Sequence, residues 1–329
     1  MKRGSVLLVL AALLVSVLGQ GVAAAASGRG PGTGGTYAAN GAKVDIANVN
    51  VTATTTSQKF AIYGRISVQN PTARLYIGLL SNCAGGTKPQ AASTRNLGQG
   101  KSAVMYVRWV FVAPAPGTYS CRIQAEANVP GRSVGQPNPD GTFEKFTING
   151  ADSYIDWAGS STTQWMTQSP AAEWEDPRYD PEDLLALNKP VDLRQMSWTA
   201  PAGVNSFRAV SDLHLTNCYD KGGANKCLDA MGDTYNTKSA TVTTRLQVMQ
   251  IGKTAGTYCK VTNFPASGSQ TTVIDWTTHH LKAYHRADVS VSTASNCTRS
   301  FRIKLYTTRT AGNPVVAHGG HFSQTLVYP

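Results

Sequence analysis

The chain has 329 residues, with 30 Lys and Arg against 19 Asp and Glu, which gives a formal net charge of +11. Without an amino-terminal signal about 300 residues remain, and this length excludes a single β-sandwich domain. The excess of basic residues favours polyanionic partners such as anionic cell-surface polymers, membranes or nucleic acid. The alternative is that this charge only keeps the protein soluble.

The first 26 residues have the layout of a secretory signal peptide. Lys2 and Arg3 precede an apolar run, Val6 to Leu18, and small residues follow through Ala26. The apolar run is too short for a comfortable transmembrane span, and no later stretch approaches that length. We therefore expect cleavage near Ala26, an extracellular location and no membrane span. Residues 27–36 are rich in glycine and predict a flexible leader.

One stretch of the sequence occurs twice. Lys101 to Cys121 and Lys238 to Cys259 each open with Lys-Ser-Ala, continue as a strand-like run and end in Gly-Thr-Tyr before a cysteine. An upstream cysteine precedes each copy, Cys83 in the first and Cys218 in the second. The two copies therefore indicate a duplicated structural unit.

The duplication predicts two domains, residues 37–157 and residues 191–329, joined by a linker at residues 158–190. The linker contains six acidic and two basic residues, and it carries tryptophans that a free linker rarely has. We expect one short helix in it, with Asp180 as its N-cap and Asn188 at its end. We also expect the linker to dock on one or both basic domains.

Short segments of both domains alternate apolar and polar residues at the period of strands. The strands expected in the first domain are Val44–Ala53, Lys59–Val68, Leu75–Leu80, Val107–Phe111 and Thr142–Ile148. Residues 84–100 are expected to form a polar connection, and residues 128–141 a long hairpin loop of the kind that often holds binding residues. The strands expected in the second domain are Leu213–Leu215, Thr241–Met249, Thr257–Val261, Thr271–Trp276, Val289–Ser292, Phe301–Thr307 and Pro314–Ala317.

Tyr119 stands two residues before Cys121, after a turn that contains glycine. This arrangement resembles the tyrosine corner that leads into strand F of immunoglobulin domains. The resemblance implies an all-β chain of two tandem immunoglobulin-like β-sandwich domains. It also implies that the Tyr119 hydroxyl bonds to the upstream backbone, and that Cys83 pairs with Cys121 across the two sheets.

The sequence departs from the immunoglobulin pattern in two places. No tryptophan follows Cys83 at the usual distance, so Trp109 is expected to fill the core instead. Tyr258 stands one residue before Cys259 rather than two, which turns it to the opposite face of a regular strand unless a bulge intervenes. The chain is therefore expected to be immunoglobulin-like without being a true immunoglobulin domain.

All six cysteines lie beyond the signal, and an even number in an exported chain predicts disulfides rather than metal thiolates. Two pairings stay open in the second domain. The duplication favours Cys218 with Cys259, which leaves Cys227 for Cys297. The rival scheme joins Cys218 to Cys227 and Cys259 to Cys297.

All six histidines lie in the second domain. Five of them have a spacing that partly suggests metal ligands: His279, His280, His285, His318 and His321. No HExxH motif accompanies them, and their segments do not have the pattern of a helix that would place two ligands on one face. Histidines in surface loops are the preferred interpretation, and we expect no metal and no other cofactor.

No motif for catalysis or for nucleotide binding has the sequence context that it requires. The one Gly-x-Ser-x-Gly pattern, Gly131 to Gly135, lies in the expected hairpin loop and not in a turn from a strand to a helix. The sequence has no supported Ser-x-x-Lys and no Gly-rich phosphate loop between a strand and a helix. Three aromatic residues stand near arginines, as a single-stranded nucleic-acid site requires, but core packing accounts better for Tyr76, Tyr106 and Trp109. Nucleic acid is therefore not a favoured partner.

We expect a binding or interaction protein rather than an enzyme, with a cell-surface polymer, a carbohydrate or another secreted protein as its target. An alternative is a secreted hydrolase with a site in the second domain built from His279, His280, His285 and Asp275. A third interpretation is a subunit of a secreted complex. Clustering of the four side chains in one pocket would favour the hydrolase, whereas an exposed aromatic patch would favour binding.

Overall fold

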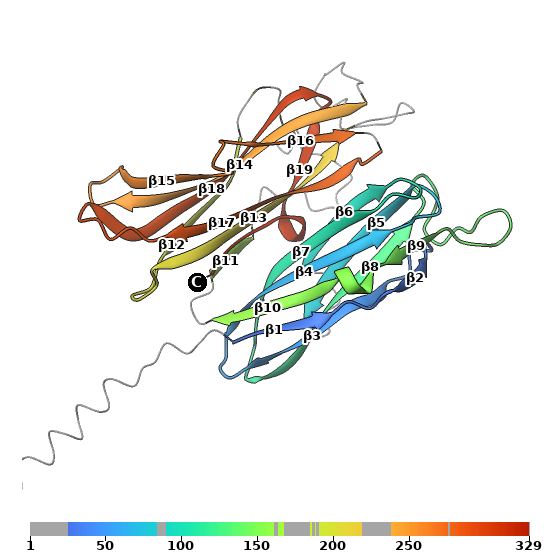
Figure 1. Ribbon diagram of the computed structural model, residues 1–329, viewed down its shortest axis with the longest axis horizontal. Helices are drawn as coiled ribbons and strands as arrows, with labels where there is room; N and C mark the ends of the chain where they lie inside the picture. The colour runs from blue at the N-terminus through green and yellow to red at the C-terminus, as the bar shows by residue number, and fades with distance from the viewer. Residues whose placement is uncertain are drawn as a thin grey trace, which may run out of the picture.

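The computed structural model describes residues 26–83, 90–160, 164–167, 185, 188, 191–218, 238–275 and 277–328. Strands account for 66% of these residues and form four antiparallel sheets, which make two sandwiches side by side (Figure 1). The predicted all-β sandwich class is confirmed. The signal peptide lies outside the described residues, and independent folding of the two sandwiches stays a prediction. Within the described ranges, no helix has the length and apolar character that a membrane span requires.

The first sandwich combines a six-stranded sheet A with a four-stranded sheet B. Sheet A has the order β1 (Ala26–Pro31), β10 (Tyr154–Ser160), β4 (Lys59–Gln69), β9 (Lys145–Ile148) and β2 (Gly35–Ala38), and β7 (Ala103–Val112) also pairs with β4. Sheet B has the order β3 (Val44–Ala53), β8 (Gly117–Asn128), β5 (Leu75–Cys83) and β6 (Ala91–Leu97). The short 3-10 helix η1 (Gly150–Asp152) precedes β10.

The second sandwich combines two five-stranded sheets, C and D. Sheet C has the order β11 (Gln164–Thr167), β20 (Gln324–Tyr328), β13 (Ser206–Asn217) and β17 (His280–Ser290), and β19 (Val315–His318) also pairs with β13. Sheet D has the order β12 (Val191–Thr199), β18 (Cys297–Gly312), β14 (Ser239–Gly252) and β15 (Tyr258–Phe264), and β16 (Gln270–Asp275) also pairs with β14. The 3-10 helix η3 (Gly320–Phe322) connects β19 to β20.

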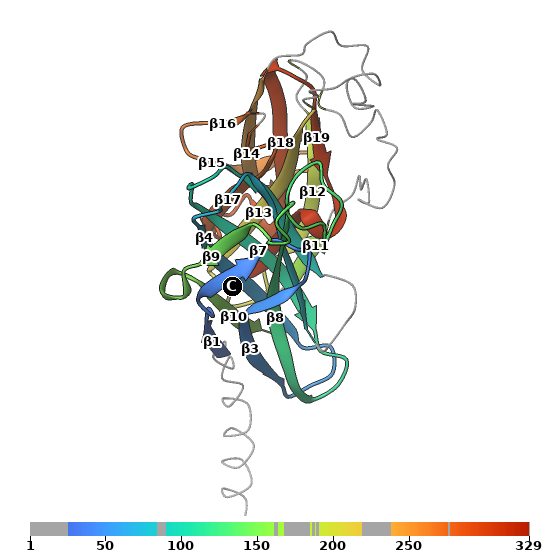
Figure 2. The same ribbon diagram turned by 90° about the vertical axis from the view of Figure 1, so that its right-hand side faces the viewer.

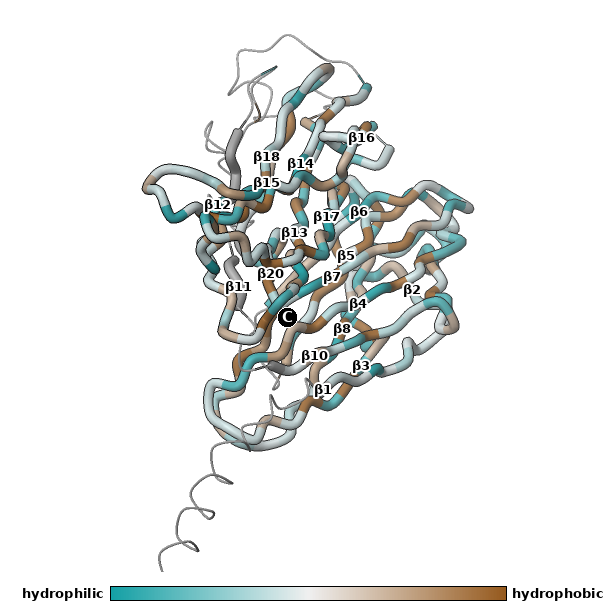
Figure 3. Tube along the Cα trace, turned by 60° about the vertical axis from the view of Figure 1, so that its left-hand side comes forward, coloured by the Kyte–Doolittle hydropathy of each residue, from teal (hydrophilic) through white to brown (hydrophobic). Residues whose placement is uncertain are grey.

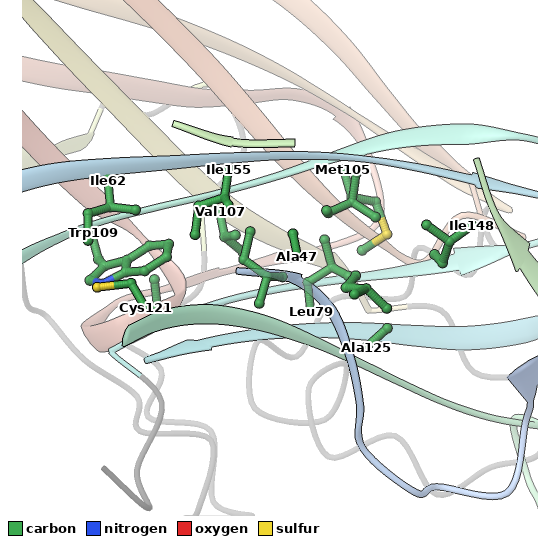
Figure 4. Close-up of a cluster of buried hydrophobic side chains, with 14 of the residues drawn as sticks. Ala47, Ile62, Leu79, Met105, Val107, Trp109, Cys121, Ala125, Ile148 and Ile155 are labelled. Atoms are coloured by element: carbon green, nitrogen blue, oxygen red, sulfur yellow. The ribbon is translucent and has the colours of Figure 1, made fainter. Parts of the chain in front are cut away.

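Alternation of apolar and polar residues along the strands places one face of each sheet in a core (Figure 3). In the first sandwich, Ile62 and Val107 of sheet A meet Leu79 of sheet B, and each is at most 1% exposed (Figure 4). Trp109 lies in the same core, where its indole N–H points to the Cys83 sulfur at 3.3 Å. Trp109 therefore fills the core, as its position on an apolar strand face predicts.

The disulfides agree with one sequence-based pairing and contradict another. Cys83 bonds to Cys121, but these residues lie directly opposite each other on β5 and β8, so the bond lies within sheet B instead of joining two sheets. Cys259 bonds to Cys297, because the two residues flank the same end of β14. The pairings of Cys218 with Cys259 and of Cys227 with Cys297 are therefore wrong, whereas the bond between Cys259 and Cys297 in the rival scheme is confirmed. Cys218 is also disulfide-bonded, and Cys227 lies outside the described residues.

The two duplicated tyrosines have different environments. The Tyr119 hydroxyl donates a hydrogen bond to the Ala115 carbonyl oxygen at 2.7 Å, as the resemblance to a tyrosine corner implies. Tyr258 is 39% exposed, and its hydroxyl accepts a hydrogen bond from Arg302 at 3.1 Å. A bulge does occur beside Cys259, since Lys260 pairs with Gln250 and Tyr258 pairs with the next residue of β14. The bulge nevertheless leaves Tyr258 at the surface, so the second copy lacks the corner contact.

Replacing Tyr119 with phenylalanine is expected to lower the free energy of unfolding by about 1 kcal/mol, because one hydrogen bond to a backbone carbonyl is lost. Urea unfolding measures this difference. Tyr37→Phe is a matched control, since the Tyr37 hydroxyl makes only a 3.5 Å contact with Thr33. An equal loss in both variants would contradict a special role for the Tyr119 corner.

Three segments that the sequence indicates as irregular contain strands. Residues 27–36 are not a free leader, because β1 pairs with β10 over its whole length and β2 begins at Gly35. The glycines of this segment let it pack closely on neighbouring strands, since a Cβ at Gly30 would collide with the Asn48 carbonyl oxygen. Part of the predicted linker, β11, pairs with β20 in sheet C. The connection at residues 84–100 includes β6.

Most of the predicted linker helix lies outside the described residues. Leu185 is 1% exposed in the second core, and its backbone N–H donates to the Val315 carbonyl oxygen at 2.9 Å. Asn188 has a positive φ of 57°, a conformation that asparagine adopts more readily than most residues. These two positions attach the end of the linker to the second sandwich. Neither is helical, and the Leu185 N–H bonds to Val315 and not within a helix, so the predicted helix does not extend through Leu185.

Candidate ligand-binding cleft between the sandwiches

Edge strands of the first sandwich pack against sheet C of the second. β6 and β7 contact β17, β20 and η3, and Figures 1 and 2 show the second sandwich running alongside them. Side chains of the second sandwich bind the open edge of β6. Lys282 donates to the Ala92 carbonyl oxygen and Gln324 to the Gln90 carbonyl oxygen, each at 2.8 Å. The contact thereby satisfies a strand edge that would otherwise be open to another chain.

A buried ion pair joins the two sandwiches. Arg108 of β7 donates through Nη1 to Asp212 Oδ2 of β13 at 3.2 Å, and the two side chains are 3% and 1% exposed. Lys282 Nζ lies 3.7 Å from Asp212 Oδ1, and the Gln324 backbone N–H donates to the same oxygen at 2.9 Å. A buried ion pair is stable only when its distances and angles are favourable, because both charges lose their hydration. The pair therefore fixes the position of β7 relative to β13.

Three tyrosines surround the Arg108 guanidinium. Its central carbon lies 3.6 Å from the ring centroid of Tyr284, 4.6 Å from that of Tyr63 and 5.4 Å from that of Tyr106. These distances are within the range of cation–π attraction. Burial raises the pKa of the Tyr63 and Tyr284 hydroxyls above their ordinary value, so both stay protonated at neutral pH and available as donors.

A cleft of about 650 Å³ opens beside this group. One wall comes from β1, β4 and β10 of the first sandwich, and the other from β13, β17 and β20 of the second. Half-buried tyrosine side chains line both walls: Tyr63, Tyr154, Tyr284 and Tyr328. Trp157 also borders the cleft, but its ring packs on Phe60 at the edge of the first core. The volume is in the range of pockets that hold small molecules or short segments of a polymer.

Paired charges form the rim of the cleft. Arg29 makes two hydrogen bonds to Asp156, at 2.6 and 2.9 Å, and lies over the Tyr154 ring at 4.1 Å. On the other wall, Arg208 and Arg286 share Asp288 at 2.7 and 3.1 Å. Hydrogen bonds from these two arginines hold the pKa of Asp288 below its usual value. The rim therefore offers both donors and carboxylate acceptors.

One donor at the cleft remains unused. Arg108 Nη2 is buried and has no hydrogen-bond partner among the described residues, although Arg108 lines the cleft. A buried donor without a partner is costly, by about 1–3 kcal/mol. A ligand oxygen could accept this hydrogen bond after a shift of the tyrosine rings that cover the guanidinium.

The structure places the predicted metal candidates away from the cleft. The His280 and His318 rings both contact the Thr216 hydroxyl, at 2.7 Å from Nδ1 and Nε2 respectively. The His214 ring centroid lies 5.6 Å from that of His280 and 5.1 Å from that of His318. The threonine hydroxyl thus occupies the point where the two ring nitrogens converge. In the described part of the chain, no three His, Cys, Asp or Glu side chains are arranged to hold a metal ion.

The other histidine candidates are dispersed. The His279 ring lies 4.4 Å from that of His280, His285 contacts the Thr244 hydroxyl at 2.7 Å, and the His321 ring packs on Phe322 at 4.3 Å. The surface-loop interpretation is wrong for several of these histidines. His280, His285 and His318 lie on strands and are 5%, 4% and 2% exposed, because they face the interior between the sheets or between the sandwiches.

Burial keeps these imidazoles neutral. It lowers the pKa of His279, His285 and His318 to about 4. It also lowers the pKa of His214 and His280 well below the ordinary value, and the neighbouring histidines add to this effect. The cluster therefore serves as a set of neutral hydrogen-bonding side chains at neutral pH.

The residues of the hydrolase hypothesis do not line the cleft. The Asp275 carboxylate accepts hydrogen bonds from Thr277 and Thr278, both at 2.6 Å, and so caps its own turn. His285 contacts Thr244 in the second sandwich instead of Asp275. The four side chains thus do not form one pocket, whereas the aromatic residues do.

The residues of the cleft were missed by sequence reasoning. Tyr63, Arg108 and Tyr284 come from three strands that lie far apart in the chain. The only sequence signal is an aromatic or basic residue at the outward position of an alternating strand, such as Arg108 between Val107 and Trp109. That signal does not show which outward positions face one another.

Comparisons with known proteins add little to this geometry. No protein-family model matches the sequence, and no curated protein matches it. The chain is similar to the tandem CBM22-1-CBM22-2 domain of Paenibacillus barcinonensis Xyn10C, at 10% identity over 94% of this chain and 100% of that chain, with a TM-score of 0.23. A structure of infectious bursal disease virus, Gx strain, is similar at 11% identity over 92% of this chain and 67% of that chain, with a TM-score of 0.29. Likenesses this distant carry no argument about function.

Proposed function

We propose that this chain is an exported binding protein that holds a carbohydrate in the cleft between its two sandwiches. The observation that carries the proposal is the lining of the cleft. Four tyrosines and four arginines converge there on one opening. Aromatic residues and arginine are the side chains that most often dominate binding energy at recognition sites.

The chemistry of a sugar fits this lining. A sugar ring has an apolar C–H face that can lie on an aromatic ring, and hydroxyl groups that both donate and accept hydrogen bonds. The cleft supplies ring faces, arginine donors, and the carboxylate oxygens of Asp156 and Asp288 as acceptors. A protein partner would instead need about 800 Å² of buried surface on each side, which favours a broad face over a cleft.

Tryptophan fluorescence tests the proposal, because Trp157 lines the cleft. Soluble oligosaccharides are titrated into the protein, and we expect a saturable emission change that Trp157→Phe abolishes. Removal of an aromatic wall by Tyr154→Ala is expected to weaken binding about tenfold.

The matched control is Tyr258→Ala, which removes an exposed tyrosine from sheet D, outside the cleft. Its affinity should equal that of the unaltered protein. Loss of binding in Tyr258→Ala with no change in Tyr154→Ala would refute the cleft as the site. Failure of every polysaccharide in a broad panel to bind would refute the carbohydrate function.

A further inference from the structure

Positive charges outnumber negative charges around the cleft. Its lining has four arginines and one carboxylate: Arg29, Arg108, Arg208 and Arg286 against Asp156. The ion pairs of these residues add Lys282, Asp212 and Asp288 beside the lining, which makes five cationic side chains and three carboxylates among the described residues. The difference, five minus three, is two positive charges. All five cations lie within 4 Å of a carboxylate oxygen, so the excess arises where two cations share one carboxylate.

The two shared carboxylates lie at different depths. Asp212 is 1% exposed and serves Arg108 and Lys282 at the floor. Asp288 is 62% exposed and serves Arg208 and Arg286 at the rim. Each position therefore has one positive charge in excess. The excess at the floor acts more strongly on a ligand, because water screens it less there.

The unused donor lies at the floor as well. Arg108 is 3% exposed, and its Nη2 has no hydrogen-bond partner among the described residues. Its Nη1 is already bound to Asp212. A guanidinium with one nitrogen engaged and the other without a partner is suited to an anionic oxygen, since charge-assisted hydrogen bonds are stronger than neutral ones. Excess charge and an unpaired, buried donor thus coincide at one residue.

On the basis of the proposed carbohydrate binding, we infer that the ligand of the cleft is an acidic polysaccharide. One carboxylate or sulfate group binds Arg108 at the floor, and a neighbouring acidic group binds between Arg208 and Arg286 at the rim. The sugar rings between these groups lie on the tyrosines of the walls. Carboxylate and sulfate share the chemistry that the cleft recognises, and the experiment below separates them.

The mixed charge of the rim favours an acidic polysaccharide over a nucleic acid. A phosphodiester backbone has a negative charge at every residue and would be repelled by Asp156 and Asp288. Both carboxylates already accept hydrogen bonds from arginines, and sugar hydroxyls can donate to their remaining lone pairs. Two excess positive charges also suit a polymer with widely spaced acidic groups.

Titration calorimetry with four probes tests the inference: polygalacturonate with carboxylates, dextran sulfate with sulfates, unmodified dextran without charge, and single-stranded oligo(dT). We expect at least one acidic polysaccharide to bind ten or more times as tightly as unmodified dextran. Its affinity should fall about tenfold between 50 mM and 500 mM NaCl, because salt screens charges over this range.

Two rim variants locate the charges. Arg208→Gln and Arg286→Gln each leave Asp288 with one cation, so both proteins should fold, and each should weaken acidic binding about fivefold. Dextran binding should fall by much less, because glutamine keeps a hydrogen-bond donor and removes only the charge. Arg302→Gln, on sheet D outside the cleft, should leave the affinity unchanged. Circular dichroism confirms that each variant is folded.

Several results would overturn the inference. Equal, salt-independent binding of dextran and acidic polysaccharides in the cleft would refute the acidic ligand and leave the proposed carbohydrate function intact. Oligo(dT) that binds as tightly as the acidic polysaccharides would refute the ligand class. An equal loss in Arg302→Gln and the rim variants would refute the rim site. Absence of binding to all polysaccharides would refute the carbohydrate function as well.

Discussion

Replacing Asp212 with asparagine is expected to lower the free energy of unfolding by about 3–5 kcal/mol, because the change leaves Arg108 and Lys282 buried without a carboxylate. The side chain is 1% exposed and contacts Arg108, Lys282 and the Gln324 backbone N–H. An asparagine amide provides one acceptor oxygen where the carboxylate provides two. Since native domains are stable by only about 5–15 kcal/mol, this change threatens the fold as a whole. Urea unfolding followed by tryptophan fluorescence measures the loss.

A surface ion pair of the same protein provides the control. Asp45 lies 3.5 Å from Arg122, and the two side chains are 52% and 37% exposed. Asp45→Asn is expected to change the free energy of unfolding by less than about 1 kcal/mol, because exposed pairs are screened by water. Comparable losses in Asp45→Asn and Asp212→Asn would contradict the importance of burial.

A double variant separates the unpaired charge from a general defect at this position. Removing the arginine charge as well, in Arg108→Gln with Asp212→Asn, is expected to recover part of the stability, because one of the two stranded cations is gone. Lys282 keeps its hydrogen bond to the Ala92 carbonyl oxygen. The control is the single variant Arg108→Gln. If Arg108→Gln lowers the free energy of unfolding by the same amount in Asp212→Asn as in the original protein, the two residues are not coupled.

Local sequence patterns predicted some of the strands, because alternation reports which face of a strand is buried. β3 has the predicted bounds, Val44–Ala53, and β4 extends the predicted strand by one residue. The apolar positions of β7 identified Trp109 as a core residue. β1 was missed because its glycines were interpreted as flexible, whereas they allow close packing against β3 and β10.

Features that depend on contacts between distant strands were not accessible from the sequence. The disulfide between Cys259 and Cys297 follows from the position of both residues at one end of β14, and the duplication gave no information on that register. Likewise, the alternation along β7 places Arg108 on the outward face of the strand, yet Arg108 is buried because the second sandwich covers β7. Polar strand positions become buried wherever two sandwiches meet, and alternation within one strand does not reveal this.

Acidification from pH 7 to pH 4.5 is expected to destabilise the folded protein before its carboxylates protonate extensively. Burial lowers the pKa of His285 and His318 from 6.5 to about 4. Between these values the unfolded chain binds protons that the folded chain does not, so the free energy of unfolding falls as the pH falls. Each such histidine contributes a slope of up to about 1.4 kcal/mol per pH unit. Urea unfolding at intervals of half a pH unit measures the slope.

His285 isolates one contribution to this slope, because burial alone lowers its pKa, whereas His214, His280 and His318 influence one another. His285→Gln keeps a polar group near the Thr244 hydroxyl and removes the titrating ring. The variant is expected to be less stable than the original protein at pH 7 but to lose less stability on acidification, with a slope lower by about 1 kcal/mol per pH unit near pH 5. The same slope in both proteins would mean that His285 is not a buried neutral imidazole. Stability that rises between pH 7 and pH 5 would contradict the whole account, because lowered histidine pKa values can only reduce stability in that direction.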